Sequence, residues 1–161
     1  MPLNPAQLTS GLTSVLQAFL PNGALVAKQM AAVYTSYAAA GLFGASAPVL
    51  TPAHTAALEG ALLGALTLPP QAGTPANLAN AWAAGLLAFW IPGTPVAGAQ
   101  VGTVIACAGS ALVVGPMIAA FTNIYSTAPL TAALMASAIH AATITTTAAV
   151  VPPPGTILPL L

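Results

Sequence analysis

The sequence predicts a mainly α-helical protein with a small β component, an α+β fold built as a bundle of short alanine-rich helices. Residues 1–92 contain four apolar segments with the spacing of amphipathic helices. From Thr94 onward, β-branched residues and glycines become frequent, which favours one or two short strands in the C-terminal half. The length of 161 residues predicts a single domain over residues 1–151, with a helical half (1–92) and a mixed half (93–151), followed by a proline-rich extended arm (152–161).

The four helices of the first half have recognisable boundaries. Three begin with a capping residue followed by proline, at Asn4-Pro5, Thr51-Pro52 and Thr74-Pro75. An N-cap side chain accepts a hydrogen bond from a free amide, and proline at the next position has no amide to satisfy. The other helix is predicted over about residues 24–40 and ends at Gly41. The apolar positions that define the four helices are Leu8, Leu12, Val15, Leu16 and Phe19; Val33, Tyr34 and Tyr37; Leu58, Leu62, Leu63 and Leu66; and Leu78, Trp82, Leu86 and Phe89.

The second half mixes strand and helix signals. Residues 94–105 predict a loop that leads into a short strand, and residues 111–122 predict a helix that is interrupted at Gly115-Pro116 or begins at Pro116. Ser126-Thr127 caps a further helix, and the β-branched run over residues 143–151 predicts a strand. Four apolar residues of that helix are expected to share one face: Leu130, Leu134, Met135 and Ile139.

The C-terminal arm and one tryptophan are the candidate interface residues. Three prolines at 152–154 indicate a polyproline II segment. The apolar side chains after it would each contribute about 1.5–3 kcal/mol on burial, so the arm docks either on a neighbouring subunit or back on its own core. Trp90 follows Phe89 directly and is expected to point away from the main apolar stripe, as an interface anchor. The candidate residues are Trp90, Ile157, Leu158, Leu160 and Leu161.

Charge is the most unusual property of the sequence. Hydrophobic residues make up 58% of the chain and charged residues 1%, namely Lys28 and Glu59, against about a quarter charged in ordinary soluble domains. A net charge of zero argues against a nucleic-acid partner, and the high hydrophobicity excludes a disordered chain. An exterior with so few charges is tolerated either in a lipid bilayer or in an assembly whose subunits cover one another.

A bilayer location is the alternative. Residues 101–121 carry no charge and are long enough to span the hydrocarbon. Glycines and Pro116 divide this segment, which therefore indicates two short elements. Membrane proteins are oriented by Lys and Arg residues in short loops, whereas this chain has one Lys, inside a helical pattern. A small integral membrane protein, holin-like or channel-forming, is the second hypothesis.

Candidate catalytic or metal-binding groups are few. His54 and Glu59 are five residues apart and fall on different helical faces, so they form no local metal site. Cys107 is expected in the core, His140 beside the carbonyls at a helix C-terminus, and the Gly60-x-x-x-Gly64 motif at a close helix contact. The sequence accordingly predicts no enzyme activity, no cofactor and no metal, and it predicts core positions for Tyr34, Tyr37, Trp82 and Phe89.

Several segments resemble one protein family. They are Pro2-Leu3-Asn4-Pro5, Leu87-Ala88-Phe89-Trp90 with Gly93 after it, and residues 138–145, within a succession of alanine-rich helices. In this respect the chain resembles a short virion structural protein of tailed, especially contractile-tailed, bacteriophages. The resemblance implies a place in the virion, in the tail, neck or baseplate, and no catalytic residues. It also implies a homo-oligomer in a symmetric assembly, with other virion structural proteins as partners.

Overall fold

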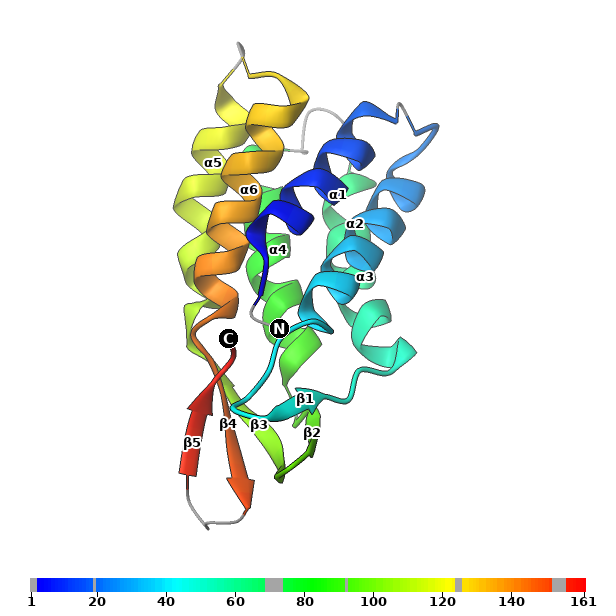
Figure 1. The fold of residues 1–161 in the computed structure, drawn as a ribbon. Helices are drawn as coiled ribbons and strands as arrows, with labels where there is room; N and C mark the ends of the chain where they lie inside the picture. The colour runs from blue at the N-terminus through cyan, green and yellow to red at the C-terminus, as the bar shows by residue number, and fades with distance from the viewer. Residues whose placement is uncertain (1–2, 19, 69–73, 92, 124–125, 152–155) are drawn as a thin grey trace.

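The chain forms a helical body with a small sheet at one end (Figure 1). The computed structural model describes residues 3–18, 20–68, 74–91, 93–123, 126–151 and 156–161. Helices make up 62% of the structure, which confirms the predicted mainly α, α+β class. In the described part the helices are α1 (Pro5–Gln17), α2 (Gly23–Ala38), α3 (Pro52–Leu66), α4 (Pro75–Trp90), the 3-10 helix η1 (Ala108–Val113), α5 (Val114–Thr122) and α6 (Ala128–Thr143).

The sheet has the strand order β1-β2-β3-β4-β5, and every neighbouring pair is antiparallel. Its strands are β1 (Ser46–Pro48), β2 (Pro95–Gly98), β3 (Val101–Cys107), β4 (Thr146–Val151) and β5 (Thr156–Pro159). The sheet curls, and a short contact links its first and last strands. Leu42 and Leu161 exchange two backbone hydrogen bonds of 2.9 Å, and Phe43 forms a bridge to Leu160. The C-terminal residues are therefore held within the fold of their own chain.

Local capping places the helices where the sequence predicts them. α1, α3 and α4 begin at Pro5, Pro52 and Pro75. Asn4 Oδ1 accepts from the amide of Ala6 at 3.0 Å, and Thr74 Oγ1 accepts from the amide of Asn77 at 3.2 Å. At the start of α3, His54 Nδ1 accepts from the amide of Thr51 at 2.8 Å. Each contact satisfies an amide that the helix itself leaves unpaired.

A single apolar core joins the helices to the inner face of the sheet. Its largest fully buried side chains are aromatic, and they confirm the core positions predicted for Tyr34, Tyr37, Trp82 and Phe89. Cys107 is also buried, as expected. Val96, Val104, Ala148 and Leu160 extend the core onto the strands. Since such interiors are close-packed, each of these side chains fixes the position of its neighbours.

The strands differ most from the sequence-based expectation. One or two strands were expected, and the described residues form five. β1, β2 and β5 have three or four residues each, too few to show an alternating pattern. Residues 156–159 of the expected polyproline arm form β5, which pairs with β4 through Ala148↔Leu158 and Ala149↔Ile157. The three prolines at 152–154 lie outside the described residues.

Helix α6 corrects a second expectation. Leu130, Leu134, Met135 and Ile139 do not share one face: Met135 and Ile139 are buried, whereas Leu130 and Leu134 are 47% and 40% exposed. At 3.6 residues per turn, positions 130 and 139 lie on opposite sides of the helix. The helix therefore has one apolar face in the core and another on the surface.

The two glycines of the Gly60-x-x-x-Gly64 motif make no contact with another helix in the described structure. A Cβ atom added at either glycine would meet nothing within 4 Å. The predicted close helix packing at this motif is therefore wrong for the chain by itself. Both glycines are exposed in α3, where glycine lowers helix stability relative to alanine.

Replacing Gly60 with alanine is expected to stabilise the folded chain. The added methyl group meets open space, and alanine loses less backbone entropy than glycine in a helix. The free energy of unfolding should rise by about 0.5–1 kcal/mol, measured by urea denaturation. A decrease would show that the surface of α3 is more crowded than the structure indicates.

Candidate subunit interface

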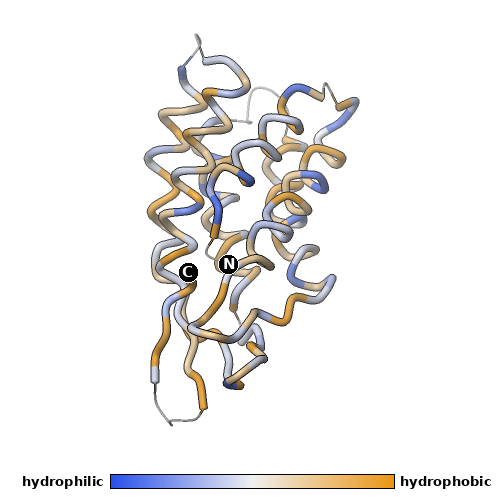
Figure 2. The backbone as a smooth tube through the Cα atoms, in the orientation of Figure 1, coloured by the Kyte–Doolittle hydropathy of each residue, from blue (hydrophilic) through white to orange (hydrophobic). Residues whose placement is uncertain are grey.

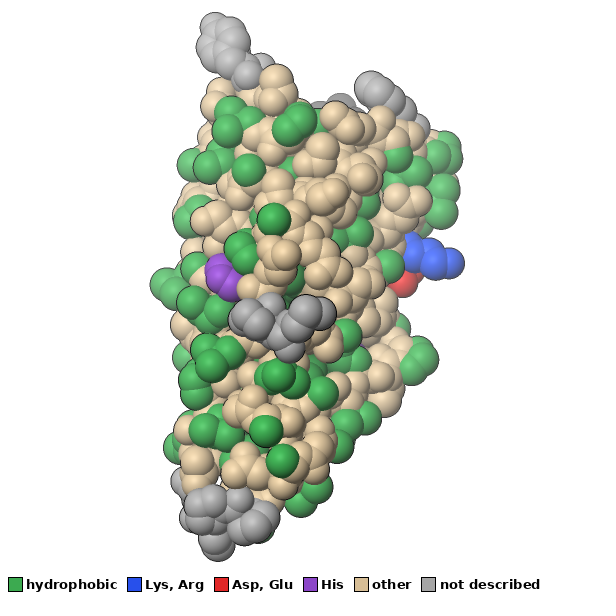
Figure 3. Space-filling view, in the orientation of Figure 1, with side chains coloured by type: hydrophobic (Ala, Val, Ile, Leu, Met, Phe, Trp, Pro, Cys, Tyr) green, Lys and Arg blue, Asp and Glu red, His purple; other side chains and the backbone are tan. Residues whose placement is uncertain are grey.

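The folded chain has the surface of an ordinary monomer but almost no charge on it. Its accessible surface is 7449 Å², and a monomeric protein of 15.7 kDa exposes about 7,300 Å². The charged side chains of the sequence are Lys28 on α2 and Glu59 on α3. On the face shown in Figure 3, blue and red atoms lie together at one edge, while the opposite edge and the sheet are green and tan with one purple histidine. The charges are thus confined to one side of the molecule.

Most exposed large hydrophobic side chains belong to the part of the sequence that carries no charged residue. Nine of the thirteen such residues in the described part of the chain follow residue 100, and no charged residue follows Glu59. Figure 2 shows hydrophobic colour along every helix and strand, the outermost included. We call the nine exposed large hydrophobic residues after residue 100 the neutral side: Val101, Ile105, Leu112, Leu130, Leu134, Ile144, Val151, Ile157 and Leu161.

Strand register explains the sheet part of the neutral side. Val101 pairs with Val151, and Thr103, Ala149 and Ile157 lie in one row across β3, β4 and β5. Residues paired in this way point to the same face of a sheet. Val101 and Ile157 are each 60% exposed, whereas Val104, Ala148 and Val150 on the opposite face are buried. The inner face completes the core and the outer face lies in solvent.

The predicted interface residues in the arm divide between these two faces. Ile157 is 60% and Leu161 58% exposed, so both are available to a partner. Leu158 packs against the core, and Leu160 is fully buried against its own chain. In the described residues 156–161, the alternative in which the arm folds back on its own core is the one observed.

The assignment of Trp90 as a surface anchor is wrong. Its side chain is fully buried, because α4 is surrounded by packed elements and Trp90 and Phe89 both point into the core. The ring of Trp90 makes edge-to-face contacts with Phe43 and Phe89. Adjacent residues of a helix can both be buried when the helix is covered on more than one side.

Trp90 belongs to a buried hydrogen-bond chain that joins three helices. Its Nε1 donates to the hydroxyl oxygen of Tyr34 at 2.8 Å. Tyr34 and Thr143 hydroxyls lie 3.1 Å apart, and Thr143 donates to the carbonyl of Ile139 at 2.7 Å. Since Thr143 has one hydroxyl proton, Tyr34 must donate to Thr143. Burial raises the pKa of Tyr34 well above its ordinary value, so the phenol stays protonated. These buried hydrogen bonds connect α4, α2 and α6.

A second polar contact lies at the edge of this cluster. The hydroxyl of Tyr37 bonds to Nδ1 of His140, so the expectation that His140 bonds to carbonyls at the helix C-terminus is wrong. Burial lowers the pKa of His140 and raises the pKa of Tyr37. Both shifts favour the neutral forms. The pair therefore joins α2 to α6 without any charge.

Lowering the pH is expected to destabilise the fold through His140. Because its pKa is lower in the folded than in the unfolded chain, the unfolded chain binds the proton first as the pH falls, and stability decreases. The loss begins as the pH falls through about 6.5, the ordinary value for histidine, and stops below the folded pKa. Urea denaturation at pH 8 and pH 5 measures it, and a His140→Gln variant should show a smaller difference. An equal difference in that variant would contradict this role.

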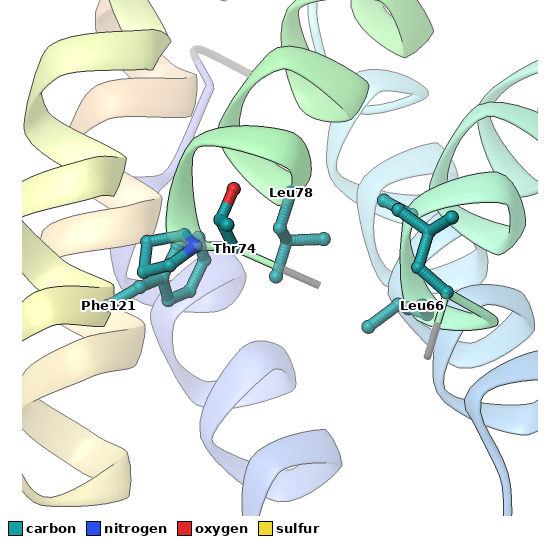
Figure 4. Close-up of a pocket in the computed structure, with 7 residues that line it drawn as sticks. Leu66, Thr74, Leu78 and Phe121 are labelled. Atoms are coloured by element: carbon teal, nitrogen blue, oxygen red, sulfur yellow. The ribbon is translucent and has the colours of Figure 1, made fainter. Parts of the chain in front are cut away.

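A groove and a buried cysteine in the described structure bear on small-molecule chemistry. A groove of about 360 Å³ between the ends of α3, α4 and α5 is lined by Leu66, Thr74, Leu78 and Phe121, with no titratable side chain (Figure 4). Residues 69–73, between α3 and α4 in the sequence, lie outside the described residues. No group of three metal-ligating side chains is found among the described residues. Burial raises the pKa of Cys107, which disfavours the reactive thiolate.

Comparison of the chain with protein-family models, with curated proteins and with solved structures finds no match. None of the described helices is both long and apolar enough to cross a bilayer. Residues 101–121, the best candidate span in the sequence, divide into β3, η1 and most of α5. The breaks follow Cys107 and Val113, so the predicted break or helix start at Gly115-Pro116 is wrong: α5 begins at Val114, and proline is tolerated in the first turn of a helix.

Proposed function

We propose that the protein is a structural subunit of a bacteriophage virion, in the tail, neck or baseplate, and that it is held there by its neutral side. The observation that carries this proposal is a surface of ordinary size on which nine large hydrophobic side chains face solvent and both charged side chains lie elsewhere. Extensive, largely apolar contacts are typical of permanent subunit interfaces. The resemblance of the sequence to short virion proteins supports the same function.

The exposed residues favour contact between faces rather than between strand edges. β5 is the last strand of the sheet, has four residues and contains Pro159, which has no amide to donate. The pairing of Leu161 with Leu42 covers the end of that edge. Short edge strands and prolines are features that prevent strand addition. Assembly therefore uses side-chain faces, with Ile157 and Leu161 among the contacting residues.

Fractionation of a phage preparation tests this function. The chain should sediment with purified particles and resist removal by high salt, since apolar contacts are not screened as charge contacts are. Mass spectrometry of the particle fraction, with a known non-virion protein as control, measures it. Recovery of the chain only with membranes, and only in detergent, would support the holin-like or channel-forming alternative and contradict the proposal.

A mutation on the neutral side tests the mechanism. Ile157→Lys places a charge where the interface should be dry, and the chain should still fold because Ile157 is 60% exposed. Incorporation into particles should fall strongly, because an unpaired charge is costly to bury. Leu25→Lys is the matched control, since Leu25 is exposed on α2 beside Lys28. Equal incorporation of both variants would contradict a role for the neutral side.

A further inference from the structure

The surface face of α6 has a symmetric pattern. Five of the exposed residues lie at spacings of three, four, four and three: Leu130, Ala133, Ser137, Ala141 and the C-cap residue Ile144, with the exposed Leu134 beside this stripe. At 3.6 residues per turn these positions fall on one side of the helix. The two ends are large and apolar, and the three central positions are small. The pattern therefore reads the same in both directions from Ser137.

This symmetry is what an antiparallel contact between two identical helices requires. A two-fold axis through Ser137 places Ser137 against its own copy, Ala133 against Ala141, and Leu130 against Ile144. In such an interface, each contact away from the axis is made twice. The small central residues allow the helix axes to approach closely, and the large residues close the two ends. The spacing also matches the seven-residue repeat of paired helices, since Leu130, Ser137 and Ile144 are seven residues apart.

Charge favours a second copy as the occupant of this face. The helices that pack on either side of α6, α1 and α5, contain no charged residue, and neither does α6 (Figure 1). An ordinary protein surface would bring charged side chains against a face that offers them no partner. The same face of another copy brings none. His140, beside the stripe, is the titratable side chain of α6, and its Nδ1 is bonded to Tyr37 within the same chain.

The size of the face is adequate for a stable contact. From Leu130 to Ile144 the helix rises about 21 Å. Three helices side by side, at spacings of 8–10 Å, give a width of about 25 Å. The product is a flat area of roughly 500 Å². Because side chains make the surface uneven, its accessible area is larger than this flat area. It is therefore on the scale of the ~800 Å² per partner that stable interfaces bury.

We infer that the surface face of α6 binds a second copy of this chain, antiparallel and about a two-fold axis at Ser137. This inference rests on the proposed function, because it names one partner of the same neutral side. The helix radius is about 2.3 Å, so axes 8–10 Å apart leave about 3.4–5.4 Å between facing Cα atoms. That range overlaps the 4.4–6.8 Å that a disulfide bridges.

Engineered cysteines test the register. Under mild oxidation, Ser137→Cys should form a covalent dimer, seen by electrophoresis without reductant. Ser36→Cys, at an exposed serine of α2, is the control and should remain monomeric on the gel. The natural Cys107 is buried and does not compete. Cross-linking of Ser137→Cys no greater than that of Ser36→Cys would overturn the inference.

Sedimentation provides a second readout. The natural chain and Ser137→Ala should sediment at dimer mass or above, and Ser137→Glu, which places two like charges on the axis, should shift to the monomer with its circular dichroism unchanged. A monomeric natural chain at tens of micromolar would overturn the inference, as would a Ser137→Glu variant that keeps the dimer. If the chain is then still found in purified particles, the proposed function stands and only this choice of partner fails.

Discussion

The Gly102→Ala variant is expected to lose most of its folding stability. A Cβ atom at this position would lie 2.0 Å from the carbonyl oxygen of Ala149 and 2.8 Å from Cα of Val150. Both atoms are backbone of β4, so no side-chain movement relieves the clash, and β3 and β4 must separate. The free energy of unfolding should fall by about 3 kcal/mol or more, a large part of what a domain of this size has.

Urea denaturation of Gly102→Ala beside Gly60→Ala checks this prediction, because the same substitution is made in both. The first should destabilise the chain and the second should stabilise it. A Gly102→Ala protein as stable as the natural chain would show that β3 and β4 do not approach as closely as the structure indicates.

The second large effect is expected for Trp90→Ala. The change removes the fully buried indole, its edge-to-face ring contacts and its hydrogen bond to Tyr34. Loss of a buried tryptophan costs about 3–5 kcal/mol, so the monomer itself should be destabilised. A surface anchor would behave differently, because its loss would weaken assembly and leave the monomer stable.

Two phenylalanine variants separate the hydrogen bond of Trp90 from its bulk. Trp90→Phe and Trp82→Phe remove similar volumes from the same core. Nε1 of Trp90 donates to Tyr34, whereas Nε1 of Trp82 is buried without a hydrogen-bond partner in the described structure. Trp90→Phe should therefore cost about 1–3 kcal/mol more than Trp82→Phe in thermal or urea unfolding. Equal losses of stability in the two variants would show that the hydrogen bond from Trp90 to Tyr34 adds no stability.

Helix starts and the core were predictable because their signals are local. A capping residue and the proline after it set the start of a helix whatever lies around it, as at Asn4-Pro5 and Thr74-Pro75. The core positions of Tyr34, Tyr37, Trp82 and Phe89 follow from apolar periodicity in the same way. The low content of charged residues, on which the proposed function is based, is evident from the sequence without the structure.

The remaining features depend on contacts between distant parts of the chain. Strand β1 pairs with β2 through Ser46↔Gly98, and the bridge Phe43↔Leu160 lies just beyond the end of β5. Both contacts join residues far apart in the sequence, which local patterns do not reveal. Periodicity places Trp90 on the surface because it cannot show that α4 is covered on several sides. For the same reason, the two apolar faces of α6 could be assigned to core and surface only after the fold was known.

The central claim is that other protein covers the neutral side in the working particle. Hydroxyl-radical footprinting, read by mass spectrometry, measures side-chain exposure directly and compares intact particles with the isolated chain. We expect the labelling of Val101, Val151 and Ile157, which face solvent in the isolated chain, to fall several-fold in particles. Labelling of these three residues that is unchanged on assembly would contradict the account.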